Sequence, residues 1–282
     1  MFFSYFTWDP SREAFFIPGI DYPILWYSLF FAGGFFLGYL IVARLLYKYL
    51  LQQREGSSPE IKQATFHFLD KLAWYLFTGM IIGARLGHVF FYDWPYYQAD
   101  PAKILLVWEG GLSSHGGGLG ILIALWLFWS NPQRRLPELS FSRLLDYLSI
   151  ATAFVAGSIR IGNFFNQEIL GTPSDLPFAV WFGHPADFGA KMPCHPVQLY
   201  EAIFYFASSY FLYKFYPKLK VGMTSGLFFI LLFTFRFFIE FLKLPQSIVD
   251  GQGLSMGQLL SLPFILFGIF LIKFHDKKGA AQ

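Results

Sequence analysis

The residues from Ile24 to Ala43 form an uncharged and strongly apolar run. An α-helix needs roughly 20 apolar residues to cross the hydrocarbon of a bilayer, and this run has that length. The composition supports the same interpretation, because 55% of the residues are hydrophobic and only 14% are charged, whereas soluble domains carry about 25% charged residues. We therefore expect an all-α membrane protein that crosses the bilayer several times.

Further apolar runs follow along the chain, some of them interrupted by single charged residues. The predicted spans after the first are residues 72–92, 110–130, 144–159, 196–213, 225–242 and 256–272. Together they predict about seven transmembrane helices in a single domain over residues 1–282. No internal repeat is visible.

The basic residues predict the orientation. Fourteen lysines and arginines fall in loops on one side of the predicted membrane and four fall on the other, so the positive-inside rule places the N-terminus outside and the C-terminus in the cytoplasm. Residues 93–109 and 161–195 then lie on the outer side. The second segment is too long for a simple turn and predicts a small cap between spans four and five. Residues 1–23 are expected to be retained and to lie at the membrane interface.

Several classes of protein and of site are disfavoured by composition. The formal net charge of +3 is too small to indicate a nucleic-acid partner. Cys194 is the only cysteine, so no disulfide can form within the chain, and its neighbour His195 does not make it a probable nucleophile. The six histidines show no metal-ligand spacing, and no nucleotide-binding loop is present. We expect neither a metal nor a cofactor.

Charged and amide side chains gather where the predicted spans reach the outer side. They are Arg85, His88, His115, Arg160, Asn163, Asn166, Glu168, Arg236 and Glu240. Such groups are costly at membrane depth and by default mark a functional site. Three arginines against two acids leave an excess of positive charge, and the planar guanidinium fits phosphate oxygens. The alternative is that each arginine simply pairs with an acid, as Arg236 and Glu240 could do on one helix face.

Two further segments carry candidate functional residues. His115 lies beside Gly116, Gly117 and Gly118, so it is either a base with room for a substrate or part of a glycine patch that packs helices. The sequence leaves both open. Glu201, inside the fifth span, is a candidate partner for a neighbouring arginine.

The segment from Gly157 to Gly171 resembles the signature of the bacterial prolipoprotein diacylglyceryl transferases. The residues that match are Arg160, Gly162, Asn163, Phe164, Phe165, Asn166, Glu168 and Gly171. Ile159 departs from the pattern, because the family has a glycine there.

The resemblance continues through nearly the whole chain in the same order. The other segments that carry it are Trp26 and Tyr27, residues 83–87 with Tyr92, residues 110–117, Asp146, residues 195–201, residues 235–240 and residues 255–258. Leu232 is a second departure, since some members have a tyrosine at this position, one turn before Arg236.

The resemblance implies an enzyme of the bacterial cytoplasmic (inner) membrane. Such an enzyme transfers the diacylglyceryl group of phosphatidylglycerol to the lipobox cysteine of a prolipoprotein, forms a thioether and releases glycerol 1-phosphate. The thiol must lose a proton before it attacks. His115 is the best candidate base by its chemistry, and the alternative is that Arg236 serves instead by its positive field.

The leaving phosphate gains negative charge, which prepositioned cations stabilise. Arg160 and Arg236 are the first candidates for this role, and Arg85 is a weaker one. Asn163 and Asn166 are suited to hydrogen-bond glycerol hydroxyls or phosphate. Glu168 and Glu240 are expected to orient the arginines, and Tyr27 to line the lipid site. The signal peptide and the lipid would enter laterally, with residues 161–195 as a gate.

Three other functions fit parts of the pattern. A transporter for an anionic lipid would use the same arginines but needs a polar path to the cytoplasmic side, where only Asp146 is found. An intramembrane protease based on Ser113 or Ser114 lacks a supporting serine motif. The third is an inactive member of the family that this sequence resembles, kept as a binding protein. The departures from the family pattern at Ile159 and Leu232 leave this function open.

Overall fold

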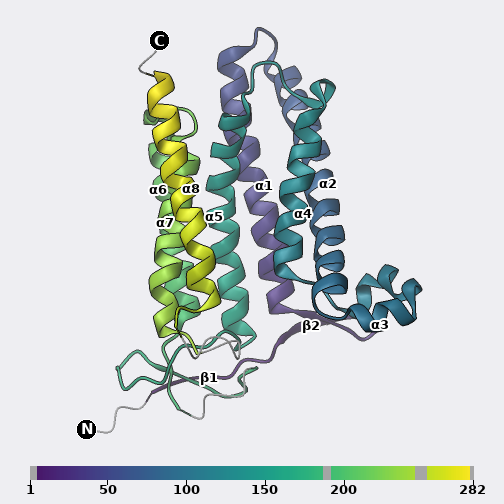
Figure 1. The fold of residues 1–282 in the computed structure, drawn as a ribbon, viewed down its shortest axis with the longest axis vertical. Helices are drawn as coiled ribbons and strands as arrows, with labels where there is room; N and C mark the ends of the chain where they lie inside the picture. Colours follow the sequence, from purple (N-terminus) through teal and green to yellow (C-terminus); the bar gives the residue numbers. More distant parts are fainter. Residues whose placement is uncertain (1–4, 187–191, 245–252, 280–282) are drawn as a thin grey trace. The chain divides into compact units, whose positions relative to one another are not determined.

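Figure 1 shows the protein as a computed structural model, which describes residues 5–186, 192–244 and 253–279. The chain falls into two compact units. The first unit comprises residues 1–42 and 142–282, and the second comprises residues 43–141.

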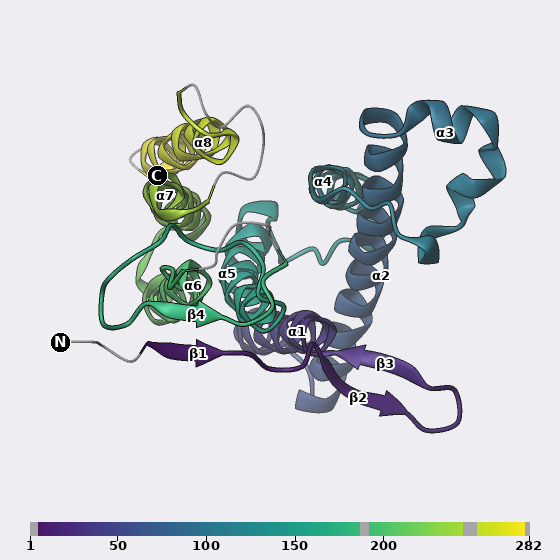
Figure 2. The same ribbon diagram turned by 90° about the horizontal axis from the view of Figure 1, so that it is seen from below.

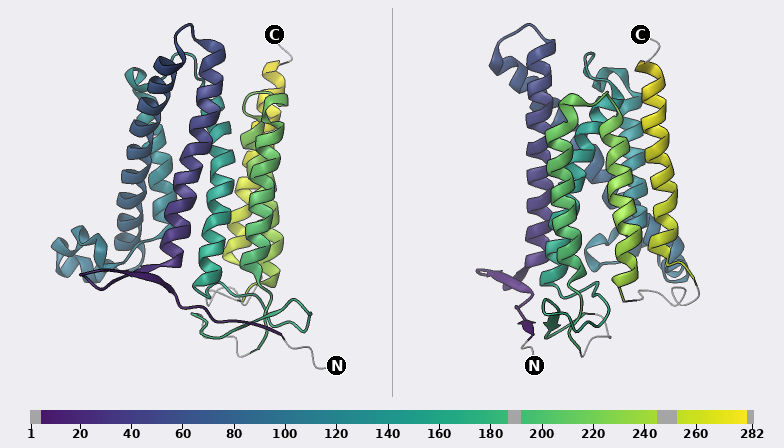
Figure 3. Two further views of the ribbon diagram at one scale, coloured as in Figure 1. Left: turned by 180° about the vertical axis from the view of Figure 1, so that it is seen from behind. Right: turned by 90° about the vertical axis from the view of Figure 1, so that its left-hand side faces the viewer.

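The described residues are mostly helical, and seven helices of 17 residues or more follow the order of the seven predicted spans. They are α1 Trp26–Gln53, α2 Ser58–Phe91, α4 Ser114–Ser130, α5 Phe141–Phe165, α6 Val197–Phe215, α7 Met223–Ile239 and α8 Met256–Gly279. Within the described residues, four helices are long and apolar enough to cross a membrane, namely α1, α5, α7 (with the turn after it) and α8. In the first unit α5, α6, α7 and α8 run side by side (Figures 1 and 3).

Several helix ends differ from the prediction, and α1 for example continues to Gln53, ten residues beyond the predicted end at Ala43. Helix α2 begins fourteen residues before the predicted span, because Ser57 and Glu60 form a capping box in which the Glu60 carboxylate accepts a hydrogen bond from the Ser57 amide at 3.0 Å. Helix α5 continues to Phe165, beyond the predicted end at Ile159. The first half of the Arg160–Gly171 segment is therefore helical.

Helices α2 and α4 of the second unit pack through glycines, and Figure 2 shows the two helices side by side. A methyl group built on Gly83 would collide with the Gly116 carbonyl, and one on Gly120 would collide with the Gly79 carbonyl and lie 3.0 Å from the Gly83 Cα. Small residues let helix backbones approach closely inside a membrane. Gly116, which follows His115 directly, and Gly120 thus serve helix packing.

Gly120→Ala should lower the free energy of unfolding by about 1–3 kcal/mol, because the added methyl forces the α2 and α4 backbones apart. Thermal unfolding in detergent would measure this change. Gly118→Ala is the matched control, since a methyl there meets nothing within 4 Å and alanine is the better helix former. Equal stability of the two variants would contradict the close packing described above.

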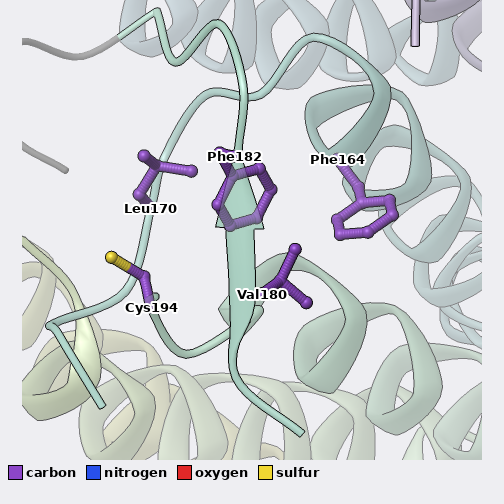
Figure 4. Packing of buried hydrophobic residues seen from close by; sticks show 5 residues of the cluster. All are labelled: Phe164, Leu170, Val180, Phe182 and Cys194. Carbon is purple, nitrogen blue, oxygen red and sulfur yellow. The ribbon is translucent and has the colours of Figure 1, made fainter. Parts of the chain in front are cut away.

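The segment between α5 and α6 folds into a small cap that includes the N-terminal strand. Strand β1 (Phe6–Trp8) pairs in parallel with β4 (Val180–Phe182), as Figure 2 shows, whereas β2 (Glu13–Ile17) and β3 (Tyr22–Leu25) form a separate antiparallel hairpin. The core of the cap is a buried cluster of five side chains (Figure 4): Phe164, Leu170, Val180, Phe182 and Cys194. The predicted cap is present, and the participation of β1 was not predicted.

Two further contacts hold β1 on the cap. The Trp8 ring stacks on Phe164 with centroids 4.6 Å apart, and its indole Nε1 donates to the Phe164 carbonyl at 3.0 Å. His184 Nδ1 lies 2.6 Å from an Asp9 carboxylate oxygen, and this hydrogen bond lowers the pKa of the Asp9 carboxyl. Chain segments more than 150 residues apart therefore form the cap together.

Asp146, the acid that stood apart from the other embedded polar residues, caps helix α7. Its carboxylate accepts hydrogen bonds from the Gly222 amide at 2.7 Å and from the Ser225 amide and hydroxyl at 2.9 and 2.8 Å. A carboxylate at a helix N-terminus satisfies amides that have no partner within the helix. This structural role gives no support to a polar path along α5.

Candidate active site

The end of α5 brings the signature side chains into one hydrogen-bonded chain. Arg160 and Asn163 are three residues apart and share a helix face, and Arg160 Nη1 donates to Asn163 Oδ1 at 2.9 Å. Asn163 Nδ2 in turn donates to Glu168 Oε1 at 2.7 Å. Asn166 Nδ2 lies 3.5 Å from the same carboxylate oxygen. Glu168 is thus linked to Arg160 through Asn163.

Glu168 reaches back to the helix because the backbone after Phe165 turns sharply. Gln167 and Ile169 adopt φ values of 53° and 58°, a left-handed region that non-glycine residues seldom occupy. Buried contacts stabilise the turn: the Gln167 side chain is fully buried, and the Gln198 amide donates to the Glu168 carbonyl at 2.8 Å. Backbone strain of this kind is concentrated at functional sites.

A buried cluster of charges holds Arg160 from the other side. Arg160 Nε lies 3.0 Å from Glu201 Oε2, which confirms that Glu201 holds a neighbouring arginine. Lys243 Nζ lies 3.0 Å from the other oxygen of Glu201 and 3.3 Å from a carboxylate oxygen of Glu240. Glu201 is fully buried, so its charge requires these cations.

Arg160 and Arg236 line one cavity of about 230 Å³ in the first unit. Its walls come from α5, α6 and α7 and are largely apolar: Thr152, Ala156, Ile159, Arg160, Tyr205, Phe228, Leu232, Phe233 and Arg236. Within the described residues no carboxylate lies within ion-pair distance of Arg236. The pairing of Arg236 with Glu240 that the sequence allowed does not form, because the Glu240 carboxylate is engaged by Lys243.

Tyr27 lies next to the signature segment. It stands in the first turn of α1, and a methyl group built on Gly162 would lie 3.0 Å from its ring and 3.2 Å from its Cα. Gly162 therefore allows α1 and α5 to approach closely at this level. The structure brings together Tyr27, Arg160, Asn163, Asn166 and Glu168, and it places Arg236, which the sequence also singled out, in the same cavity wall as Arg160.

The chain matches the prolipoprotein diacylglyceryl transferase family over residues 13–274. The chain belongs to this family. Proteins named phosphatidylglycerol–prolipoprotein diacylglyceryl transferase are similar to it almost from end to end. That of Tolumonas auensis is 43% identical over 90% of this chain and 92% of its own length. That of Porphyromonas gingivalis is 40% identical over 95% and 94%, and that of Protochlamydia amoebophila 37% identical over 95% and 94%.

Arg85, which the sequence offered as a weaker phosphate ligand, lies in the second unit and is surrounded by carbonyl groups. Its guanidinium donates to the carbonyls of Lys103, Ile104, Leu106, Gly110 and Gly111 and lies over the ring of Tyr97, 4.9 Å from its centroid. These contacts fold the α3 segment (Trp94–Ala99) and the turns after it against α2. They favour a structural role for Arg85 in this family member.

Of the two residues His115 and Cys194, the structure describes the side chain of Cys194. His115 lies in the first turn of α4 in the second unit, and its side chain is outside the described residues. Cys194 is fully buried in the cap, where burial raises the pKa of its thiol. This burial agrees with the expectation that Cys194 is not a nucleophile.

Lys243 and Tyr205 belong to the charge cluster, although the sequence did not single out either one. Lys243 is 8% exposed, and Tyr205 donates its hydroxyl to Glu201 Oε1 at 3.2 Å. The signal was in the spacing: Tyr205 follows Glu201 by four residues, and Lys243 follows Glu240 by three. From the sequence alone, Lys243 is predicted to be one of the four basic residues in the loops on the outer side.

Proposed function

We propose that this chain transfers the diacylglyceryl group of phosphatidylglycerol to the lipobox cysteine of prolipoproteins. The observation that carries the proposal is the cavity in which Arg236, without an acid partner among the described residues, faces the same space as Arg160 between apolar walls. Such a cavity suits a lipid phosphate beside acyl chains. The similar proteins described above are named for this same transfer reaction, which supports the proposal.

The proposed reaction replaces a carbon–oxygen bond by a carbon–sulfur bond. The cysteine thiolate attacks the glycerol carbon that carries the phosphate ester, and glycerol 1-phosphate leaves with the electron pair of the broken bond. The thiol proton passes to a base, for which we propose His115. The phosphate changes from a singly charged diester towards a monoester, so Arg236 and Arg160 stabilise the transition state more than the bound lipid.

The remaining residues of the site bind the lipid or orient the basic side chains. Asn166 Oδ1 is buried and has no hydrogen-bond partner in the described structure, so it is free to accept a hydrogen bond from a glycerol hydroxyl of the headgroup. Asn163 and Glu168 orient Arg160 through their hydrogen bonds. Glu240 orients Lys243, in place of the arginine that we expected it to hold. Tyr27 lines the lipid site beside Gly162.

We further propose the cellular arrangement that this reaction requires. The seven long helices span the bacterial cytoplasmic membrane, with the N-terminus outside and the C-terminus in the cytoplasm, and act as one domain. This orientation places the cap and the Arg160 cluster on the outer side, where secreted prolipoproteins present their lipobox. The lipid and the signal peptide enter laterally, and residues 161–195, of which 187–191 lie outside the described residues, gate the opening.

The test is a transfer assay with the purified protein in detergent, phosphatidylglycerol and a lipobox peptide. We expect a thioether-linked diacylglyceryl peptide and released glycerol phosphate, detected by mass spectrometry. His115→Ala should abolish transfer if the imidazole is the base, whereas a packing residue would leave the rate of a folded variant within a few fold. A folded parent protein that transfers no lipid would refute the proposal.

A further inference from the structure

Tyr205 is the tyrosine among the described residues that line the cavity shared by Arg160 and Arg236. It stands on α6, one turn after Glu201, and only 5% of its surface is exposed. Its ring packs edge-on against Phe204 and Phe235, with centroids 6.4 and 6.2 Å away. The ring is therefore fixed, and its hydroxyl has a defined position.

The hydroxyl lies among the charges of the site. It donates to Glu201 Oε1 at 3.2 Å, while the other oxygen of this carboxylate lies 3.0 Å from Arg160 Nε. Arg160 and Arg236 both lie near enough to act on the phenol electrostatically. A hydrogen bond to one carboxylate oxygen restricts the rotation of the carboxylate, so the hydroxyl keeps Glu201 turned towards Arg160.

Most of the other described residues of the cavity wall are apolar. Leu232, one turn before Arg236 on α7, lines the same cavity with an apolar side chain. The neighbouring wall residues Ile159, Phe228 and Phe233 are apolar as well.

We propose that Tyr205 is a positioning residue of the transfer reaction: its hydroxyl holds the Glu201 carboxylate in the orientation in which it pairs with Arg160. This inference rests on the proposed function, because the pair that Tyr205 positions is the one assigned to the leaving phosphate. The residue acts through Glu201 and Arg160 and takes no part in proton transfer.

The test compares Tyr205→Phe, which removes only the hydroxyl, with the parent protein in the transfer assay. Misplacing a catalytic cation by about 1 Å can cost on the order of 10²-fold in rate, so we expect kcat to fall by about 10- to 100-fold. The KM for phosphatidylglycerol should change less than about threefold, because Arg236 remains to bind the phosphate. Tyr210→Phe is the matched control on the same helix, since Tyr210 is 66% exposed.

The melting temperature of Tyr205→Phe separates positioning from structural support. A positioning role predicts the loss of kcat at an unchanged melting temperature. The proposal is overturned if Tyr205→Phe keeps full activity, or if its loss of activity follows a lowered melting temperature. An inactive parent would instead refute the proposed function.

Discussion

Replacing Arg236 with alanine should lower the rate of lipid transfer by about 10²- to 10³-fold, the loss expected when one prepositioned group that stabilises developing negative charge is removed. The reason is the charge balance of the site. Arg160 is already paired with Glu201, whereas Arg236 has no acid partner among the described residues. Its full charge is therefore available to the leaving phosphate. Initial rates in the detergent assay would measure the effect.

Arg236→Lys is the control for charge without the planar fork, and it should retain part of the rate, because a lysine meets phosphate as a point charge. Since the Arg236 side chain makes no ion pair within the described structure, neither variant should alter the melting temperature by more than a few degrees. A folded Arg236→Ala protein with a rate within threefold of the parent would contradict the assignment of Arg236 to the phosphate.

Replacing Glu201 with alanine should have the largest effect on stability, a loss of about 3–5 kcal/mol in the free energy of unfolding. Glu201 is fully buried and faces both Arg160 and Lys243 at 3.0 Å. Without its carboxylate, Arg160 keeps only neutral partners, and Lys243 keeps Glu240 alone. Unfolding by denaturant titration in detergent would measure the change, and transfer activity should fall with it, because Arg160 loses its fixed position.

A double-mutant cycle tests the origin of this loss. If uncompensated charge is the cause, adding Lys243→Met to Glu201→Ala should be less destabilising than the sum of the two single changes, because one of the stranded cations is removed. Strictly additive effects would show that the two side chains do not interact. Tyr210→Phe serves again as a control with little expected effect on stability.

The sequence predicted the parts of the fold that depend on local pattern. Each predicted apolar span corresponds to a helix of the structure, although α5 continues past the predicted end at Ile159 and so carries both Arg160 and Asn163. The candidate pairing of Glu201 with an arginine is confirmed. These features follow from helical periodicity and from the cost of a charge without a partner inside an apolar helix, both of which can be read from single segments.

Features that join distant segments could not be predicted in this way. From the sequence alone, Lys243 is interpreted as a charged loop residue, because nothing in the local pattern shows that its side chain contacts Glu201. Arg85 read as a possible phosphate ligand, although its partners are backbone carbonyls, which every residue carries alike. The pairing of β1 with β4 joins residues that are far apart in the sequence, and three-residue strands give no pattern of their own.

The pairing of β1 with β4 also limits when the cap can form during synthesis of the chain. Trp8 aligns with Phe182, 174 residues later in the chain. At a synthesis rate of about 5–20 residues per second, β1 waits roughly 10–35 seconds for its partner strand to be made. During that time α1 to α5 are produced while the cap is still incomplete. The buried cluster that contains Phe164 and Leu170, which flank the turn that carries Glu168, is therefore completed by Trp8 and Val180 only after α1 to α5 exist, so the Arg160 end of α5 matures late in biogenesis.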